Sequence, residues 1–185
     1  TFSEKYAVKM NDGSLPEWSR WAGGPQTLLC AKEVLLYLRR NYTQLRGRGV
    51  HLTASYLDVF SMNPLDECYD PRHPMTREDC YRSRAEAFEY VRGLGMAVSS
   101  EEPADCFVPH LDFVHWNGYP RESVEGGDYL GIPIPLHPLI YHDALLTPSL
   151  FDYRSSDKRA QHFLEGLSQV QIPYGQIDWD SNACF

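Results

Sequence analysis

Apolar residues recur at alternating spacings of three and four between residues 26 and 45, which is the period of an amphipathic helix. Pro25 or Thr27 marks the expected start of this helix, and Gly47 its end. Residues 50–60, which follow, are rich in apolar and β-branched side chains and predict a strand. Helix followed by strand is one half of an α/β repeat.

The same order repeats further along the chain. Thr76, with Asp79 three residues later, resembles a capping box, and an apolar face continues from there to Gly93. Residues 96–100 then predict a second strand. The sequence pattern is less distinct further on, where it predicts strands over 111–116, 132–141 and 172–179 and a short helix over 156–167. The prolines in 132–141 argue against a central, fully hydrogen-bonded strand there.

Strands alternating with helices predict an α/β fold with a parallel sheet, either an open doubly wound sheet or a (β/α)8-type barrel. No glycine-rich phosphate-binding loop follows any strand, which disfavours the nucleotide-binding version of the open sheet. A closed barrel usually needs about 250 residues. The 185 residues therefore predict one α/β domain, over 1–185, that is a shortened barrel or part of a larger catalytic barrel. Residues 1–24 are expected to form a hairpin or loop, and 25–185 the βα units.

Composition narrows the classes of function. The net charge of −8 opposes nucleic-acid binding, which needs clustered Lys and Arg. No apolar run is long enough to cross a membrane, so a soluble protein is expected. A secreted or periplasmic location stays open, with the signal peptide absent from this chain. The five cysteines form no Cys-x-x-Cys pair and predict neither a zinc knuckle nor a disulfide framework. The oligomeric state is not indicated.

Two acids lie at matching places on consecutive predicted strands. Side chains alternate between the faces of a strand, so Asp58 shares a face with Tyr56, opposite Leu57. By the same alternation Glu101 lies opposite Val98 on the next strand. Both acids are near the carboxyl ends of their strands, where barrel enzymes carry their chemistry. We therefore expect both to point toward the barrel axis.

Two facing carboxylates are what glycoside hydrolysis requires, one attacking or stabilising the anomeric carbon and one protonating the leaving oxygen. A structural alternative stays open, in which Asp58 caps a strand or pairs with an Arg, and Glu101 with Glu102 caps the next helix. Asp66, Glu67 and Asp70 follow on the next loop and either line the same pocket or form a solvated acidic loop.

Four segments together resemble the catalytic barrel of retaining α-glycosidases related to the α-N-acetylgalactosaminidase and endo-α-N-acetylgalactosaminidase families. The similarity spans about residues 48–148 and is carried by Tyr56–Phe60, Glu67–Arg77, Val98–Glu102 and Ile134–Asp143. The resemblance implies that Asp58 is the nucleophile and Glu101 the acid/base, with Glu102 as the other candidate for the acid. It implies a carbohydrate substrate and no cofactor or metal.

Several further side chains are candidates for binding the sugar. Aromatic rings stack on sugar faces, and imidazole or carboxylate groups bind sugar hydroxyls; each of these residues could equally belong to the core or to a strand end. The candidates for substrate binding are Tyr56, Glu102, Trp116, Tyr141, His142 and Asp143.

Three rival functions compare as follows with the glycosidase hypothesis. The seven histidines include no His-Glu-x-x-His helix and no His-x-His on a strand, which disfavours a catalytic metal. No Gly-x-Ser-x-Gly motif supports a serine nucleophile, and no cysteine has an evident base. A catalytically inactive carbohydrate-binding or scaffolding fragment of a glycosidase-like barrel remains as the alternative to an enzyme.

Overall fold

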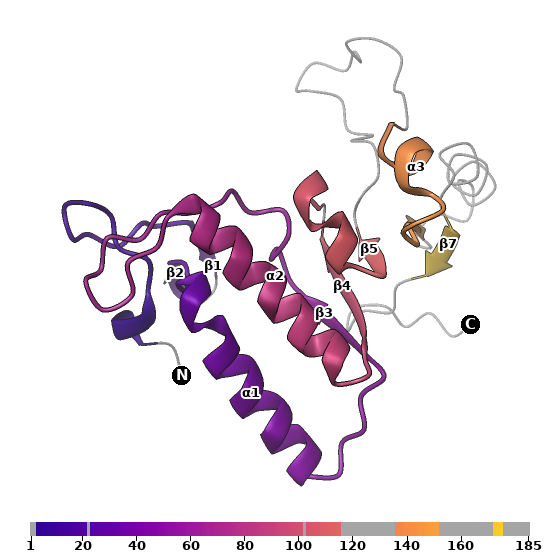
Figure 1. Ribbon diagram of the computed structural model, residues 1–185, viewed down its shortest axis with the longest axis horizontal. Coiled ribbons are helices and arrows are strands. Elements are labelled where there is room, and N and C mark those ends of the chain that lie inside the picture. Colours follow the sequence, from indigo (N-terminus) through magenta and orange to yellow (C-terminus); the bar gives the residue numbers. More distant parts are fainter. Residues whose placement is uncertain (1–2, 22, 102, 116–135, 152–171, 176–185) are drawn as a thin grey trace. The chain divides into compact units, whose positions relative to one another are not determined.

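The computed structural model describes residues 3–21, 23–101, 103–115, 136–151 and 172–175 (Figure 1). The contacts divide the chain into two compact units. Unit 1 consists of Thr1–Ser55 and Asn63–Val98, and unit 2 of Tyr56–Met62 and Ser99–Phe185. The expectation of a single domain over residues 1–185 stays a prediction.

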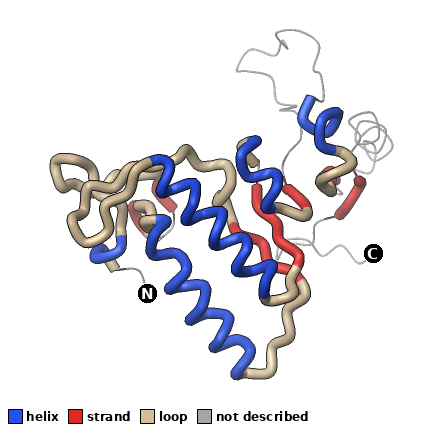
Figure 2. The backbone as a smooth tube through the Cα atoms, in the orientation of Figure 1, coloured by secondary structure: helices blue, strands red, loops and turns tan. Residues whose placement is uncertain are grey.

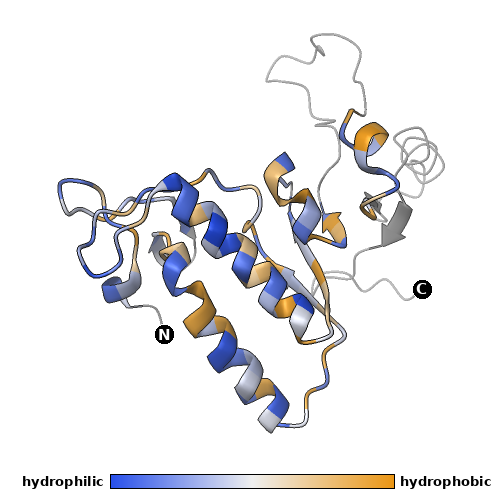
Figure 3. Cartoon of the chain, viewed as in Figure 1, coloured by the Kyte–Doolittle hydropathy of each residue, from blue (hydrophilic) through white to orange (hydrophobic). Residues whose placement is uncertain are grey.

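Two long helices, α1 (Ala31–Gly47) and α2 (Arg77–Gly93), lie side by side in unit 1 (Figure 2). The predicted capping box starts α2: the Thr76 hydroxyl accepts a hydrogen bond from the Asp79 N–H, and the Asp79 carboxylate accepts one from the Thr76 N–H. Hydrophobic and hydrophilic residues alternate along both helices (Figure 3). The buried residues are Ala31, Val34 and Tyr42 on α1, and Cys80, Arg84, Ala87, Phe88 and Val91 on α2.

The N-terminal part of unit 1 consists of loops and short elements. A 3-10 turn, η1 (Glu4–Tyr6), is followed by Ala7, which forms an antiparallel bridge with Leu29. A turn follows Met10, whose N–H donates to the Ser14 carbonyl. The antiparallel pair lies further on, between β1 (Ser19–Trp21) and β2 (Gly24–Gln26). Strand β2 also explains why α1 begins later than its apolar stripe.

A small apolar core holds this N-terminal segment to the helices of unit 1. Its members come from the segment after η1, from the start of α1, from the loop before α2 and from α2 itself. They are Val8, Cys30, Ala31, Cys68, Met75 and Cys80, with Leu28 and Leu65 packed against them.

The strands follow one another in chain order. β3 (Ala54–Leu57), β4 (Ala97–Glu101) and β5 (Phe113–His115) form a three-stranded sheet in that order, and β4 and β5 are parallel. Within unit 2, Phe113 also bridges in parallel to Leu146, just before β6 (Pro148–Phe151), and β6 pairs in parallel with β7 (Ile172–Gly175). The fold is therefore mixed α/β with parallel neighbours, and the described residues do not close a barrel.

One predicted strand is wrong. Residues 136–141, within the expected strand 132–141, form the short helix α3 (Leu136–Tyr141). Short apolar runs do not distinguish helix from strand by period alone. Pro138 lies in the first turn of α3, where a missing N–H costs no helical hydrogen bond. The first part of that run lies outside the described residues.

The other predicted elements agree in kind and differ in length. The strand expected over 50–60 is limited to β3, and the strands at 96–100 and 111–116 are β4 and β5. A 3-10 segment, η2 (Asp105–His110), joins β4 to β5. The helix expected over 156–167 lies outside the described residues, as does the end of the strand 172–179. Among the helices that the structure describes, none has the length and apolarity to cross a membrane.

Candidate active site

The turn that follows β3 carries Asp58 at an exposed position. The Tyr56 hydroxyl donates a hydrogen bond to Asp58 Oδ1 over 3.0 Å, so the two side chains lie on the same side, as the alternation of strand residues predicts. The next residue, Val59, has a φ of 49°. A β-branched residue in this left-handed region is strained by about 1–3 kcal/mol, and such strain is common at functional sites.

Glu101 reaches the same phenol from the neighbouring strand. It is the last residue of β4, and its partner in the parallel register with β5 is His115. The His115 ring in turn meets the Tyr56 ring edge to face, with centroids 5.0 Å apart. Asp58, Tyr56, Glu101 and His115 thus form one group within unit 2, which we call the carboxylate cluster.

The Tyr56 phenol reports the closeness of the two acids. Burial, the hydrogen bond to Asp58 and the negative charge of Glu101 all raise the pKa of Tyr56 well above its ordinary value, with a hydrogen bond to Glu101 contributing as well. The phenol therefore stays protonated over the physiological range and donates its single proton to Asp58. Burial lowers the pKa of His115, which favours its neutral form.

Two buried serines hold the Asp58 turn against the end of β4. Ser100 Oγ donates to the Leu57 carbonyl over 2.6 Å and accepts from the Ser61 N–H over 3.1 Å. Ser61 Oγ donates to the Glu101 carbonyl over 2.8 Å, and both serines are fully buried. Because these bonds join the backbone of both acidic segments, the positions of Asp58 and Glu101 are coupled.

The other predicted binding residues are placed differently or not described. Tyr141 is the last residue of α3, and the centroid of its ring lies 4.7 Å from that of the His137 ring. Burial and the charge of Asp105 raise the pKa of Tyr141. His142 follows the helix and donates from its backbone N–H to the Pro138 carbonyl, and Asp143 is exposed in the same turn. Within the described part of the chain, no hydrogen bond, ion pair or ring contact joins these three residues to the carboxylate cluster. Glu102 and Trp116 lie outside the described residues.

The acids of the loop after Asp58 have structural partners in unit 1. The Asp66 carboxylate accepts from Arg84 Nη2 over 2.9 Å, and Arg84 also donates to the Asn63 and Pro64 carbonyls. Asp70 accepts from Arg72 Nε over 2.8 Å. These ion pairs fix the loop.

His115 is the member of the carboxylate cluster that the sequence analysis did not select. It lies in the predicted strand 111–116, one residue before the candidate Trp116. Strand alternation alone gives two possible faces, and the register between β4 and β5 decides that His115 is opposite Glu101. A search for aromatic or imidazole groups aligned with the acid of the preceding strand would have found it.

Fold and site together are of the kind seen in glycosidase domains: parallel strands in chain order, with a carboxylate at the end of each of two neighbours. Comparison with solved structures agrees. The chain is similar to α-N-acetylgalactosaminidase NagBb from Bifidobacterium bifidum, in a quadruple mutant form, with 40% sequence identity, a TM-score of 0.85 and 96% of this chain covered. The complex of that enzyme with GalNAc gives 40% identity over 94% of this chain and a TM-score of 0.83. The complex of that enzyme with Gal-NHAc-DNJ has 40% sequence identity to this chain, covers 96% of it and gives a TM-score of 0.84.

This chain is therefore related to the α-N-acetylgalactosaminidase family of glycosidases. It spans less than a third of the NagBb chain, 28–29% of its length in these three structures. No family model and no curated protein sequence matches the chain.

Proposed function

We propose that this chain supplies the catalytic carboxylates of a retaining α-glycosidase that acts on α-linked N-acetylgalactosamine. Asp58 is the nucleophile and Glu101 the acid/base. The observation that carries the proposal is how the two acids are placed. Tyr56 donates to Asp58, its ring meets that of His115, and His115 is the register partner of Glu101.

We expect retention rather than inversion, as the resemblance to retaining α-glycosidases implies. Retaining glycosidases hold their two carboxyl groups about 5–5.5 Å apart, whereas inverting enzymes need about 6.5–9.5 Å to admit a water. The proposal therefore requires the Asp58 and Glu101 carboxyl groups to lie about 5–5.5 Å apart.

In the proposed first step, Asp58 attacks the anomeric carbon while Glu101 gives its proton to the glycosidic oxygen, and the leaving alcohol departs. A covalent glycosyl ester on Asp58 results. In the second step Glu101, now a carboxylate, takes a proton from water as the water attacks the same carbon, and the Asp58 carboxylate is released. This mechanism needs no cofactor.

The remaining members of the carboxylate cluster have supporting roles in this mechanism. Tyr56 donates to the nucleophile and so orients it, while the neutral His115 packs against the Tyr56 ring. The exposed part of the Tyr56 ring offers a face on which a sugar can stack. The preference for N-acetylgalactosamine rests on the relatives, whose structures include complexes with GalNAc and with Gal-NHAc-DNJ.

Replacing Asp58 by Asn in the full-length protein tests the nucleophile. We expect kcat on an aryl α-N-acetylgalactosaminide to fall by at least about 10⁴-fold, because covalent catalysis is lost. Proton NMR of the wild-type reaction should show the α-anomer as the first product. If the first product is the β-anomer, Asp58 is not a nucleophile and the retaining mechanism is wrong.

A comparison of Glu101→Gln with Glu102→Gln decides between the two candidates for the acid. The proposal expects the large loss of kcat in Glu101→Gln. A wild-type protein that binds N-acetylgalactosamine but releases no aglycone from any α-linked aryl glycoside would favour the inactive carbohydrate-binding alternative.

A further inference from the structure

Unit 1 contains a second group of side chains that the glycosidase mechanism does not use. It consists of Cys30, just before α1, and of Cys68 and His73 in the loop before α2. The two Sγ atoms and the ring nitrogen all lie within 4.8 Å of one another. All three side chains are buried, with exposed fractions of 0%, 3% and 5%. We call this group the thiol cluster.

The spacing within the thiol cluster is that of ligands around one metal ion. Zinc–sulfur bonds of about 2.3 Å and zinc–nitrogen bonds of about 2.0 Å, at tetrahedral angles, place neighbouring ligand atoms about 3.5–3.8 Å apart. Cys68 Sγ lies 3.4 Å from His73 Nδ1. Cys30 Sγ lies 3.7 Å from the Met75 sulfur, which adds a fourth polarisable atom next to the cluster.

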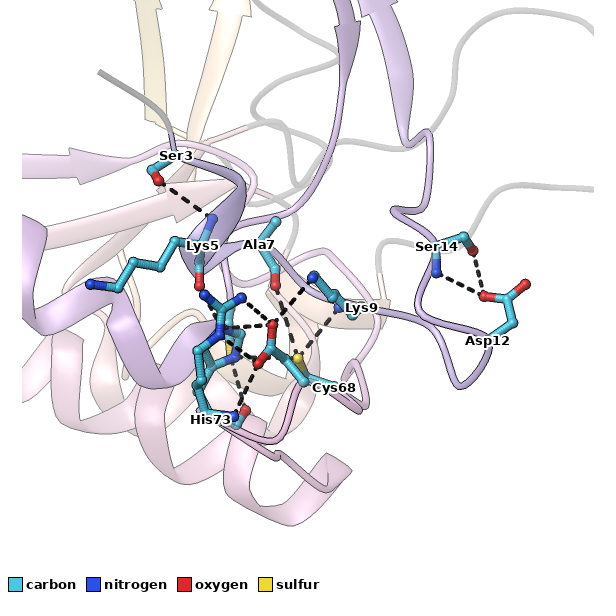
Figure 4. A network of polar contacts seen from close by, with 11 residues as sticks. Ser3, Lys5, Ala7, Lys9, Asp12, Ser14, Cys68 and His73 are labelled. Atoms are coloured by element: carbon cyan, nitrogen blue, oxygen red, sulfur yellow. Dashed lines mark hydrogen bonds and ion pairs between the residues drawn. The ribbon is translucent and has the colours of Figure 1, made fainter.

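The surroundings prepare His73 for binding through Nδ1. Its other ring nitrogen, Nε2, lies 2.9 Å from the Lys5 carbonyl, which can only accept a hydrogen bond. Nε2 therefore carries the proton, and the lone pair of Nδ1 faces Cys68. A backbone carbonyl that fixes the tautomer in this way is the usual second partner of a metal-bound histidine. Figure 4 shows His73 and Cys68 together below the Lys5 carbonyl.

Cys68 is prepared in a complementary way. The Lys9 N–H points to Cys68 Sγ over 3.4 Å, and an N–H donor stabilises the thiolate form of sulfur (Figure 4). Two thiolates would neutralise the double charge of a zinc ion, so the loaded site would bury no net charge. The cluster is thus built for a cation rather than for an isolated anion.

We propose that Cys30, Cys68 and His73 bind a structural zinc ion that joins the start of α1 to the loop before α2. This goes beyond the glycosidase function and differs from the sequence-based expectation, which included no metal. Zinc fits because two thiolates and an imidazole are its preferred ligands in structural sites. The burial of all three ligands makes the role structural rather than catalytic.

Two other uses of these residues are possible. Cys30 and Cys68 are buried, whereas reactive thiols are partly exposed, so a catalytic cysteine is disfavoured. A disulfide between Cys30 and Cys68 is the remaining alternative, and it would leave the orientation of His73 without a function.

The test is the metal content of the full-length protein, purified under reducing conditions without chelator. We expect about one zinc per chain by mass spectrometry of the metal. Exchange with Co²⁺ should give thiolate-to-cobalt charge-transfer absorption and the intense visible bands of a tetrahedral site. Removal of zinc by a strong chelator should lower the melting temperature, and added zinc should restore it.

Matched variants separate the cluster from general effects on the core. Cys68→Ser and His73→Gln should lose bound zinc and the cobalt spectrum. Cys80→Ser, equally buried in the same apolar core but outside the thiol cluster, should keep both. Should the serine variants fail to fold, the cobalt spectrum and chelator response of the wild type still decide. Zinc below a tenth of the protein concentration, a Cys30–Cys68 disulfide in the isolated protein, or copper in place of zinc would each overturn the proposal.

Discussion

The acidic side chains of the two units differ in their partners. In unit 1, Asp66 and Asp70 face the guanidinium groups of Arg84 and Arg72. In unit 2, Asp58 accepts its hydrogen bond from a neutral phenol, that of Tyr56. A carboxylate held by a cation is stabilised in its charged form and committed to the fold. A carboxylate held by a neutral donor at an exposed strand end keeps a lone pair that a substrate can reach.

The difference teaches how to tell a structural acid from a candidate for catalysis when both lie on one stretch of chain. Distance along the sequence does not distinguish them, since Asp58 and Asp66 belong to the same turn and loop region. The hydrogen-bond and ion-pair partners of the two carboxylates do distinguish them. The comparison predicts that changes in unit 1 affect stability and that changes in the carboxylate cluster affect turnover.

After Asp58→Asn, the largest effect on turnover is expected for Glu101→Gln, which removes the proposed acid/base. Positioned acid–base groups contribute about 10²–10⁴-fold, and kcat on a natural glycoside should fall by that factor. The loss should be smaller for an aryl glycoside with a good leaving group, since such a group departs without a proton. Kinetics on both substrates measure this. Glu67→Gln, which changes an exposed acid paired with Arg77, should leave kcat unchanged; equal losses would break the comparison.

Arg84→Met should have the largest effect on folding. The Arg84 side chain is 5% exposed, and its loss leaves the Asp66 carboxylate without this cation in a partly buried position. Removal of one partner of a buried ion pair costs about 3–5 kcal/mol in the free energy of unfolding. Urea denaturation of the full-length protein gives the value. Arg82→Met, on the same helix and paired with Glu78 on the surface, should cost less than about 0.5 kcal/mol.

Tyr56→Phe should have a smaller effect on turnover. A hydrogen bond to a charged group contributes about 1.5–3 kcal/mol, so kcat/KM should fall about 10- to 100-fold. Tyr69→Phe is the matched control, because Tyr69 also donates to an acid two residues away, Glu67, over 2.9 Å. No loss of kcat/KM in Tyr56→Phe, or the same loss in both variants, would count against a role of the phenol in catalysis.

Asp79→Asn should give the smallest effect, seen as a change in acid sensitivity. Hydrogen bonds from the Thr76 backbone and side chain hold the pKa of Asp79 below its usual value. A carboxyl with a lowered folded pKa contributes stability above its unfolded value of about 3.9, and this stability is lost as the pH falls toward the folded value. Melting temperatures from about pH 6 to pH 2 should therefore fall more in wild type than in Asp79→Asn. Glu86→Gln, an exposed acid on the same helix, should follow wild type.

Local rules predicted the parts of the fold that depend on local contacts. The capping box at Thr76 and the helix that follows it required nothing beyond neighbouring residues. The run around Pro138 was misjudged because both helix and strand accept short apolar sequences, and tertiary packing decides between them. The pairing of Ala7 with the distant Leu29 is a non-local contact that the sequence pattern does not contain.

The sequence predicted the candidate site as a pair of residues without its geometry, and the catalytic roles of the pair stay a prediction. Strand alternation identified Asp58 and Glu101 as candidates on matching faces. The link through Tyr56 and the presence of His115 depend on strand register, which alternation does not contain. The thiol cluster was not found because its residues match no short motif with regular spacing; Cys30 joins Cys68 and His73 through the packing of unit 1.

The phenol of Tyr56 also offers a way to watch catalysis. Its high pKa depends in part on the negative charge of Asp58. Ester formation on Asp58 would remove that charge, and the phenol would then ionise at lower alkalinity than in the resting protein. Ultraviolet difference spectra of the tyrosinate band, recorded with and without a slow substrate that accumulates the glycosyl ester, would turn this side chain into an intrinsic indicator of the intermediate.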